Sequence, residues 1–113
     1  MTRRILQINE LIKREVGKIM QDVIDDSRFQ FVTIVKVETS PDLKNTKLFL
    51  SYIGDEKHEK EIRTVLKKHS FMIQKQLNRT LEMRNVPRIS FEFDYSARYS
   101  QRIERLIKES KDD

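Results

Sequence analysis

Seven lysine and arginine side chains between residues 63 and 88 are the part of this sequence best suited to binding a ligand. One acid, Glu82, lies among them, so this segment carries a net charge of +6 in a chain whose total is +5. Clustered positive charge attracts polyanions, and the partner class that it most often signals is nucleic acid. The alternative is a solvated helix face that happens to be basic. The seven residues are Arg63, Lys67, Lys68, Lys75, Arg79, Arg84 and Arg88.

Lysines and arginines spaced along a helix can meet successive phosphates of a nucleic acid without reading its bases. Phe71 is the one aromatic residue interleaved with the basic positions, and its place beside an apolar stripe predicts packing. Recognition of the backbone or shape of structured RNA is therefore favoured over base stacking. Four basic residues near the N-terminus join the set. The candidate RNA-binding residues are Lys67, Lys68, Lys75, Arg79, Arg84, Arg88, Arg3, Arg4, Lys13 and Lys18.

Groups suited to catalysis or metal binding are sparse. The absence of cysteine excludes disulfides, thiolate nucleophiles and Cys-based metal sites, and it fits a reducing cytoplasm. His58 lies among charged residues at a helix start, where we expect it to be solvated, and His69 lies on an apolar stripe, where packing is expected. Gly17 and Gly54 alone cannot form a glycine-rich phosphate loop. We therefore predict a non-enzyme with no metal and no cofactor.

The basic residues need elements to position them, and apolar spacing indicates which. Apolar residues recur every three or four positions over 5–24, which predicts a long helix. Residues 31–38 are rich in β-branched side chains and predict a strand apolar on both faces, while 46–53 predict a second strand. The turn at Ser40-Pro41-Asp42 is short, so the two strands should pair antiparallel.

Helical spacing resumes over 56–82 and is long enough for two helices joined by a kink. Pro87 bars helix, and strict alternation over 88–95 predicts a third strand, parallel to the second because a helical crossover separates them. Ser96 can cap a final helix whose stripe ends at Ile107, and 110–113 should be a frayed tail.

The expected order is therefore α-β-β-α(α)-β-α, an α+β fold with a three-stranded mixed sheet covered by helices. A length of 113 residues fits one domain, 1–113, with a single core. No apolar run reaches ~18 residues, and the N-terminus has no signal-peptide block, so we expect a cytoplasmic protein with no membrane partner.

Three stretches of the chain resemble the bacterial ribosome-binding factor A family. Residues 32–55 are similar to the family's strand-turn-strand signature, and 73–94 are similar to its passage from helix to strand. Asp26 and Arg28 match its acidic-x-Arg junction after the first helix. The turn matches at Ser40, Pro41, Asp42 and Leu43. The later stretch matches at Arg84, Val86, Pro87, Phe91 and Asp94.

The resemblance implies a type II KH-like domain that binds free small (30S) ribosomal subunits as a monomer. It also implies help in late maturation and processing of 16S rRNA, notably under cold stress, with no small-molecule substrate. The family has an Ala-x-Gly kink between its central helices, where this chain has His69, Ser70 and Phe71. We predict a kink there nonetheless, because Ser70 can bend a helix by bonding back to a carbonyl. Two alternatives are a KH-like module for another structured RNA and a basic domain that binds an acidic protein.

Overall fold

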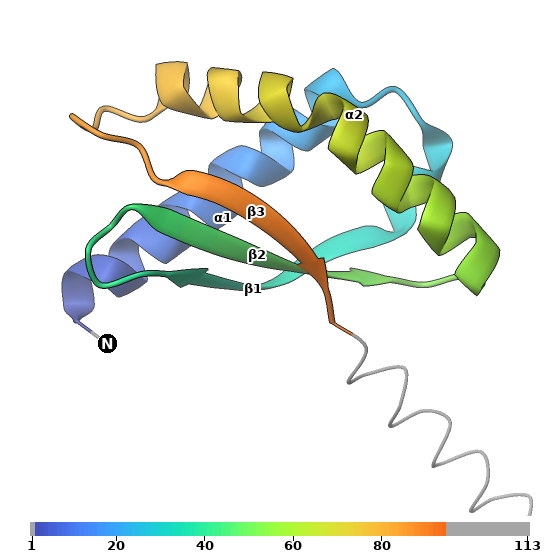
Figure 1. Cartoon of the computed structure of the whole chain (residues 1–113), viewed down its shortest axis with the longest axis horizontal. Helices are drawn as coiled ribbons and strands as arrows, with labels where there is room; N and C mark the ends of the chain where they lie inside the picture. The colour runs from blue at the N-terminus through green and yellow to red at the C-terminus, as the bar shows by residue number, and fades with distance from the viewer. Residues whose placement is uncertain (1, 95–113) are drawn as a thin grey trace, which may run out of the picture.

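The computed structural model describes residues 2–94, which form two long helices, one short helix and three strands (Figure 1). The predicted final helix from Ser96 to Ile107, Tyr95 and the tail at 110–113 lie outside the described residues. The elements are α1 (Arg3–Val23), the 3₁₀ helix η1 (Ser27–Phe31), β1 (Val32–Thr39), β2 (Asn45–Tyr52), α2 (Glu56–Thr80) and β3 (Arg88–Phe93).

The sheet has the order β1-β2-β3, with β1 antiparallel and β3 parallel to the central strand β2. Both pairings agree with the sequence prediction, and the expected α+β fold with a mixed three-stranded sheet is confirmed. Side chains of α1 and α2 share one apolar cluster with one face of the sheet. The molecule therefore has two layers, with the helices together on one side.

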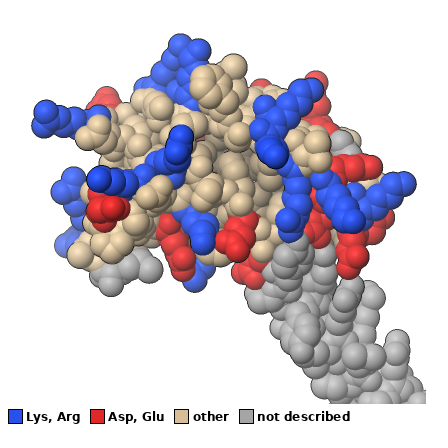
Figure 2. Space-filling view, in the orientation of Figure 1, with Lys and Arg blue, Asp and Glu red and all other residues tan. Residues whose placement is uncertain are grey.

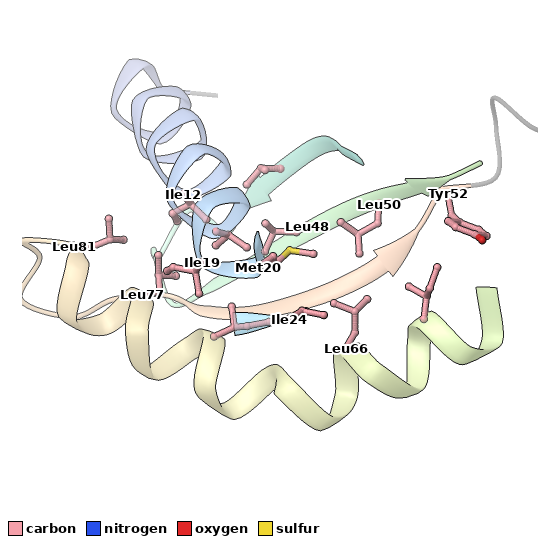
Figure 3. Close-up of a cluster of buried hydrophobic side chains, with 14 of the residues drawn as sticks. Ile12, Ile19, Met20, Ile24, Leu48, Leu50, Tyr52, Leu66, Leu77 and Leu81 are labelled. Carbon is pink, nitrogen blue, oxygen red and sulfur yellow. The ribbon is translucent and has the colours of Figure 1, made fainter. Parts of the chain in front are cut away.

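The core lies between these layers, and its apolar side chains point toward one another from α1, β2 and α2 (Figure 3). The central strand supplies the alternate residues Leu48, Leu50 and Tyr52, all of which are buried. Helix α1 meets them with the stripe that contains Ile12, and α2 does so with Leu66 and its neighbours. Burial of these side chains provides the main driving force for folding.

Hydrogen bonds between three buried polar side chains connect α1 to the sheet. The Thr39 hydroxyl donates to Asn9 Oδ1 at 2.6 Å, and its oxygen lies 2.9 Å from the Thr46 hydroxyl. Asn9 belongs to α1, Thr39 to β1 and Thr46 to β2. All three side chains are buried and have partners, so they avoid the cost of an unpaired polar group. This chain of hydrogen bonds sets the register between the helix and the two strands.

Strand β1 contains a bulge at Val35, where the register with β2 shifts between Ile34 and Lys36. The extra residue reverses the alternation, so that Ile34 before it and Val37 after it both face the core. Val35 itself is 44% exposed. The expectation that this strand is apolar on both faces is thus corrected: one face is buried, and the other is the open side of the sheet.

The turn between β1 and β2 is held by its own side chains. The Ser40 hydroxyl donates to Asp42 Oδ1 at 2.6 Å, and the same carboxylate oxygen accepts from the Lys44 amide at 3.1 Å. These two hydrogen bonds lower the pKa of Asp42, with that from Ser40 the larger cause. The Asn45 amide donates to Ser40 Oγ at 3.1 Å and closes the turn. The residues that match the family signature therefore build this turn.

Leu43 in this turn has a φ of 61°, a left-handed conformation that costs a side-chain-bearing residue roughly 1 kcal/mol. Its side chain packs on the core, which offsets this cost. Both Leu43→Ala and Leu43→Gly lose that packing, but only glycine adopts the conformation freely. We expect Leu43→Gly to be more stable than Leu43→Ala by about 1 kcal/mol in urea unfolding.

The exposed helical residue Leu6 provides the control, because glycine there should be less stable than alanine by about 1 kcal/mol. The same order of glycine and alanine at Leu43 and Leu6 would contradict the left-handed turn.

Helix α2 is one continuous helix of 25 residues, so the prediction of two helices joined at His69, Ser70 and Phe71 is wrong. The helix is nevertheless bent, and its two halves run in different directions (Figure 1). The Ser70 hydroxyl donates to the Lys67 carbonyl at 2.9 Å, and His69 Nδ1 lies 2.9 Å from the Val65 carbonyl. Such back-bonds bend a helix without breaking it. Without a glycine, the backbone has kept its helical hydrogen bonds.

Both ends of α2 are anchored. At its start, Asp55 accepts from the His58 amide at 2.8 Å, and this hydrogen bond lowers the pKa of Asp55. Nearer its end, the Gln74 side chain donates to the Pro87 carbonyl at 3.1 Å and accepts from the Ile89 amide at 2.8 Å. One side-chain amide thereby ties α2 to the start of β3.

Candidate RNA-binding surface

The ten candidate basic residues lie at several separate places on the molecule. Figure 2 shows basic side chains standing out from one face at separated points, with acidic side chains gathered mainly where α2 begins. Nine of the ten are exposed and Lys13 is half-buried. The clustering seen along the sequence therefore does not become one continuous patch.

The largest group lies on α2 and consists of Lys67, Lys68, Lys75 and Arg79, which we call the α2 basic surface. Lys68, Lys75 and Arg79 are separated by seven and four residues, so they share one side of the helix. Within residues 2–94, no acidic side chain forms an ion pair with any of the four. This surface is therefore free to meet phosphates.

Lys67 also borders a groove of about 480 Å³ between α2 and β3. On the helix side the groove is lined by Arg63 and Ser70, and on the strand side by Ser90 and Glu92. The Arg63 guanidinium lies 4.9 Å from the centre of the Phe93 ring and 3.3 Å from Glu59 Oε1. Arg63 is thus held in place by its own neighbours.

A second group of basic residues lies beside the turn between β1 and β2. Arg4, Lys44 and Arg84 line one pocket there, together with Asp42 and Glu82. Lys44 was not among the residues predicted from the sequence. Parallel pairing of Asn45 with Arg88 brings it to this place, and the Lys44 carbonyl accepts from the Arg88 amide at 2.9 Å.

A third group, Lys13, Arg14 and Lys18, lines a cleft between α1 and β1. Lys18 Nζ lies 4.0 Å and Arg14 Nε 3.4 Å from Glu15 Oε1, so two of the three cations are already paired. Glu10 and Asp26 line the same cleft. The cleft should therefore attract an anion less strongly than the α2 basic surface does.

The last two candidates stand apart. Arg3 is the first residue of α1, and Arg88 is the first residue of β3, where it lies on the open side of the sheet. On that side Lys47 Nζ is 3.4 Å from Glu92, and Lys36 Nζ is 2.7 Å from Glu38. The hydrogen bond from Lys36 to Glu38 raises the pKa of this lysine. Arg88 is therefore next to a face whose other charges largely neutralise each other.

Phe71 differs from the sequence prediction, which expected it to pack. Its side chain is 77% exposed, and the adjacent Met72 is 44% exposed, while Ile73 on the other side of the helix is fully buried. The predicted solvation of His58 and partial burial of His69 agree with the structure. The spacing of apolar residues along the helix could not show whether Phe71 packs in the core or stands exposed among lysines.

Residues 2–94 contain neither a cluster of metal ligands nor a helix able to cross a membrane. No group of three or more His, Asp or Glu side chains there could hold a metal ion. Neither α1 nor α2 combines the length and the apolar character needed to cross a bilayer.

Comparison with known structures supports the fold. A solution structure of a Thermotoga maritima protein matches 80% of this chain and 86% of its own, with a TM-score of 0.70 and 21% identity. The crystal structure of ribosome-binding factor A from Thermus thermophilus matches 79% of this chain and 93% of its own, with a TM-score of 0.67 and 22% identity. A homology model of Thermus thermophilus ribosome-binding factor A, fitted into a cryo-electron microscopy map of its 30S complex, has a TM-score of 0.62 and 23% identity. The match covers 77% of this chain and 91% of that chain.

Sequence comparison supports the family. Ribosome-binding factor A of Lachnospira eligens is 39% identical over 104 residues, which are 91% of this chain and 80% of that protein. The model of the family described as "Ribosome-binding factor A" matches residues 4–107. The chain therefore belongs to the ribosome-binding factor A family.

Proposed function

We propose that this protein binds the free small ribosomal subunit in the cytoplasm and assists late maturation of 16S rRNA, notably in the cold. The observation that carries the proposal is the match of the family model to residues 4–107. A relative from Thermus thermophilus has been fitted into a map of its 30S complex, which supports the same partner for this chain. The protein would act as a monomer and without covalent chemistry, by stabilising one conformation of immature rRNA.

The geometry fits this role because the exposed cations form groups at two separate places, on α2 and beside the β1–β2 turn. A phosphate contact needs only a cation at the right place, and the α2 basic surface presents four along one helix. The second group, at Arg4, Lys44 and Arg84, adds a separate point of contact. Two points of contact would fix the orientation of the protein on a folded RNA, whereas one would leave it free to turn.

The proposal is tested in cells that lack the protein. We expect them to accumulate unprocessed precursor of the small-subunit rRNA, most strongly in the cold, and the precursor is measured by primer extension across its ends. Tagged protein from a lysate should sediment with free small subunits and be absent from translating ribosomes. Normal precursor levels and normal subunit ratios would contradict the proposal. Sedimentation with another RNA, or with a protein free of RNA, would identify one of the two alternative functions.

A further inference from the structure

The exposed ring of Phe71 lies at the centre of the α2 basic surface. Residues three and four positions away along a helix are its surface neighbours, and for Phe71 these are Lys67, Lys68, Gln74 and Lys75. Three of the four are therefore lysines, all of them exposed, and none forms an ion pair with an acid within the described residues. A single exposed apolar residue is ordinary, but an aromatic ring bordered by three free cations is a particular chemical arrangement.

The curvature of α2 increases access to the ring. The helix bows away from the core, with its outer side convex (Figure 3). Phe71, at 77% exposure, lies on the solvent side of this curve, whereas the Ile73 side chain points to the core. Side chains on a convex surface diverge, so the lysines can lean outward and leave the face of the ring open.

We propose that Phe71 stacks on an unpaired nucleobase of single-stranded RNA while Lys67, Lys68 and Lys75 bind the phosphates beside it. Every base has a π-face, so such a contact needs no particular sequence, and the flanking phosphates supply the negative charge that three lysines require. Duplex RNA does not offer an accessible base face along its length. The inference rests on the proposed function, because both require α2 to meet RNA, and it adds that the RNA segment meeting α2 is unpaired.

Two RNA probes of equal charge separate stacking from phosphate binding. One is a short unstructured oligonucleotide, and the other has the same length with abasic riboses in place of its nucleotides. Phe71→Ala should bind the first about tenfold more weakly than the parent protein and the abasic probe equally well. The dependence of affinity on salt should not change, because no cation is lost. Equal affinities of Phe71→Ala and the parent for the unstructured oligonucleotide would overturn the inference.

Phe31 provides a matched control, since it is 50% exposed and belongs to η1 rather than α2. Phe31→Ala should bind both probes like the parent. An equal loss of affinity in Phe31→Ala and Phe71→Ala would show a general effect of lost apolar surface and would also overturn the inference.

Fluorescence gives a direct readout of stacking. The sequence contains no tryptophan, so Phe71→Trp and Phe31→Trp each introduce a single reporter. The unstructured oligonucleotide should quench the emission of Phe71→Trp and leave that of Phe31→Trp unchanged, and the abasic probe should quench neither. Unchanged emission of Phe71→Trp in a bound complex would contradict stacking.

The inference and the proposed function can fail separately. If Phe71→Ala keeps the full preference for the probe with bases while the protein sediments with free small subunits, only the stacking role is wrong. If the parent protein binds neither small subunits nor the probes, the proposed function is wrong, and the stacking role falls with it.

Discussion

Replacing Lys75 and Arg79 together by alanine should weaken binding to small-subunit rRNA on the order of thirtyfold near ~0.1 M salt. Each phosphate contact contributes about 0.7 to 0.9 to the slope of log K against log salt, so the slope should fall by roughly 1.5. Because phosphates carry no sequence information, the loss should be similar for other RNAs. Filter binding at a series of salt concentrations measures both quantities. Neither residue is buried, so the fold should be unaffected.

The same helix offers a matched control in Lys57 and Lys60. Both are exposed, and they lie in the acid-rich first turns of α2 near Glu56, Glu59 and Glu61. Replacing this pair by alanine makes the same change in net charge but should alter affinity and slope much less. A slope unchanged by loss of Lys75 and Arg79 would place the main contact elsewhere, most directly at the group of Arg4, Lys44 and Arg84.

Leu48→Ala should lower the free energy of unfolding by about 2 to 5 kcal/mol. Leu48 is fully buried in the central strand, where it is paired with Val37 of β1 and Phe91 of β3. Truncation leaves a cavity in the middle of the core. Because both helices and the sheet contribute to this core, the surrounding side chains can fill the cavity only partly. A domain of this size is stable by roughly 5 to 15 kcal/mol, and the variant should therefore be close to unfolding under mild denaturant.

Urea unfolding followed by circular dichroism measures this change. Ile53, which directly follows β2 and is 78% exposed, serves as the control, and Ile53→Ala should change stability by at most about 0.5 kcal/mol. Similar destabilisation by the two substitutions would show that the central strand does not carry the core.

The fold could be predicted largely because its signals are local. The spacing of apolar residues in α1, the alternation in β3 and the short Ser40–Asn45 turn each indicate their structure within a few residues. The parallel pairing of β3 then follows from the helical crossover. The bulge at Val35 could not be predicted in this way, because the consecutive apolar residues Ile34 and Val35 do not show which of them leaves the alternation.

The candidate surface was predictable only in part, because it depends on placement in space. A count of charges along 63–88 finds Lys68, Lys75 and Arg79, but it gives no reason to include Lys44, which reaches Arg4 and Arg84 through strand pairing. Phe71 lies at the margin of the apolar stripe, where a small rotation of the helix decides between core and solvent. The bend of α2 likewise depends on hydrogen bonds of Ser70 and His69 that a pattern of hydrophobicity does not contain.

The Gln74 side chain has a consequence for the protein's behaviour at high concentration. Within residues 2–94, β1 and β3 are the edge strands, and an edge strand with unpaired peptide groups can recruit a strand from another molecule. Gln74 occupies Pro87 O and Ile89 N, so its amide takes the place that an incoming peptide group would need. On the opposite edge, the bulge at Val35 and the charge of Lys36 disrupt the regular ladder. Both features oppose growth of the sheet from molecule to molecule, Gln74 at the start of β3 and the bulge in the middle of β1.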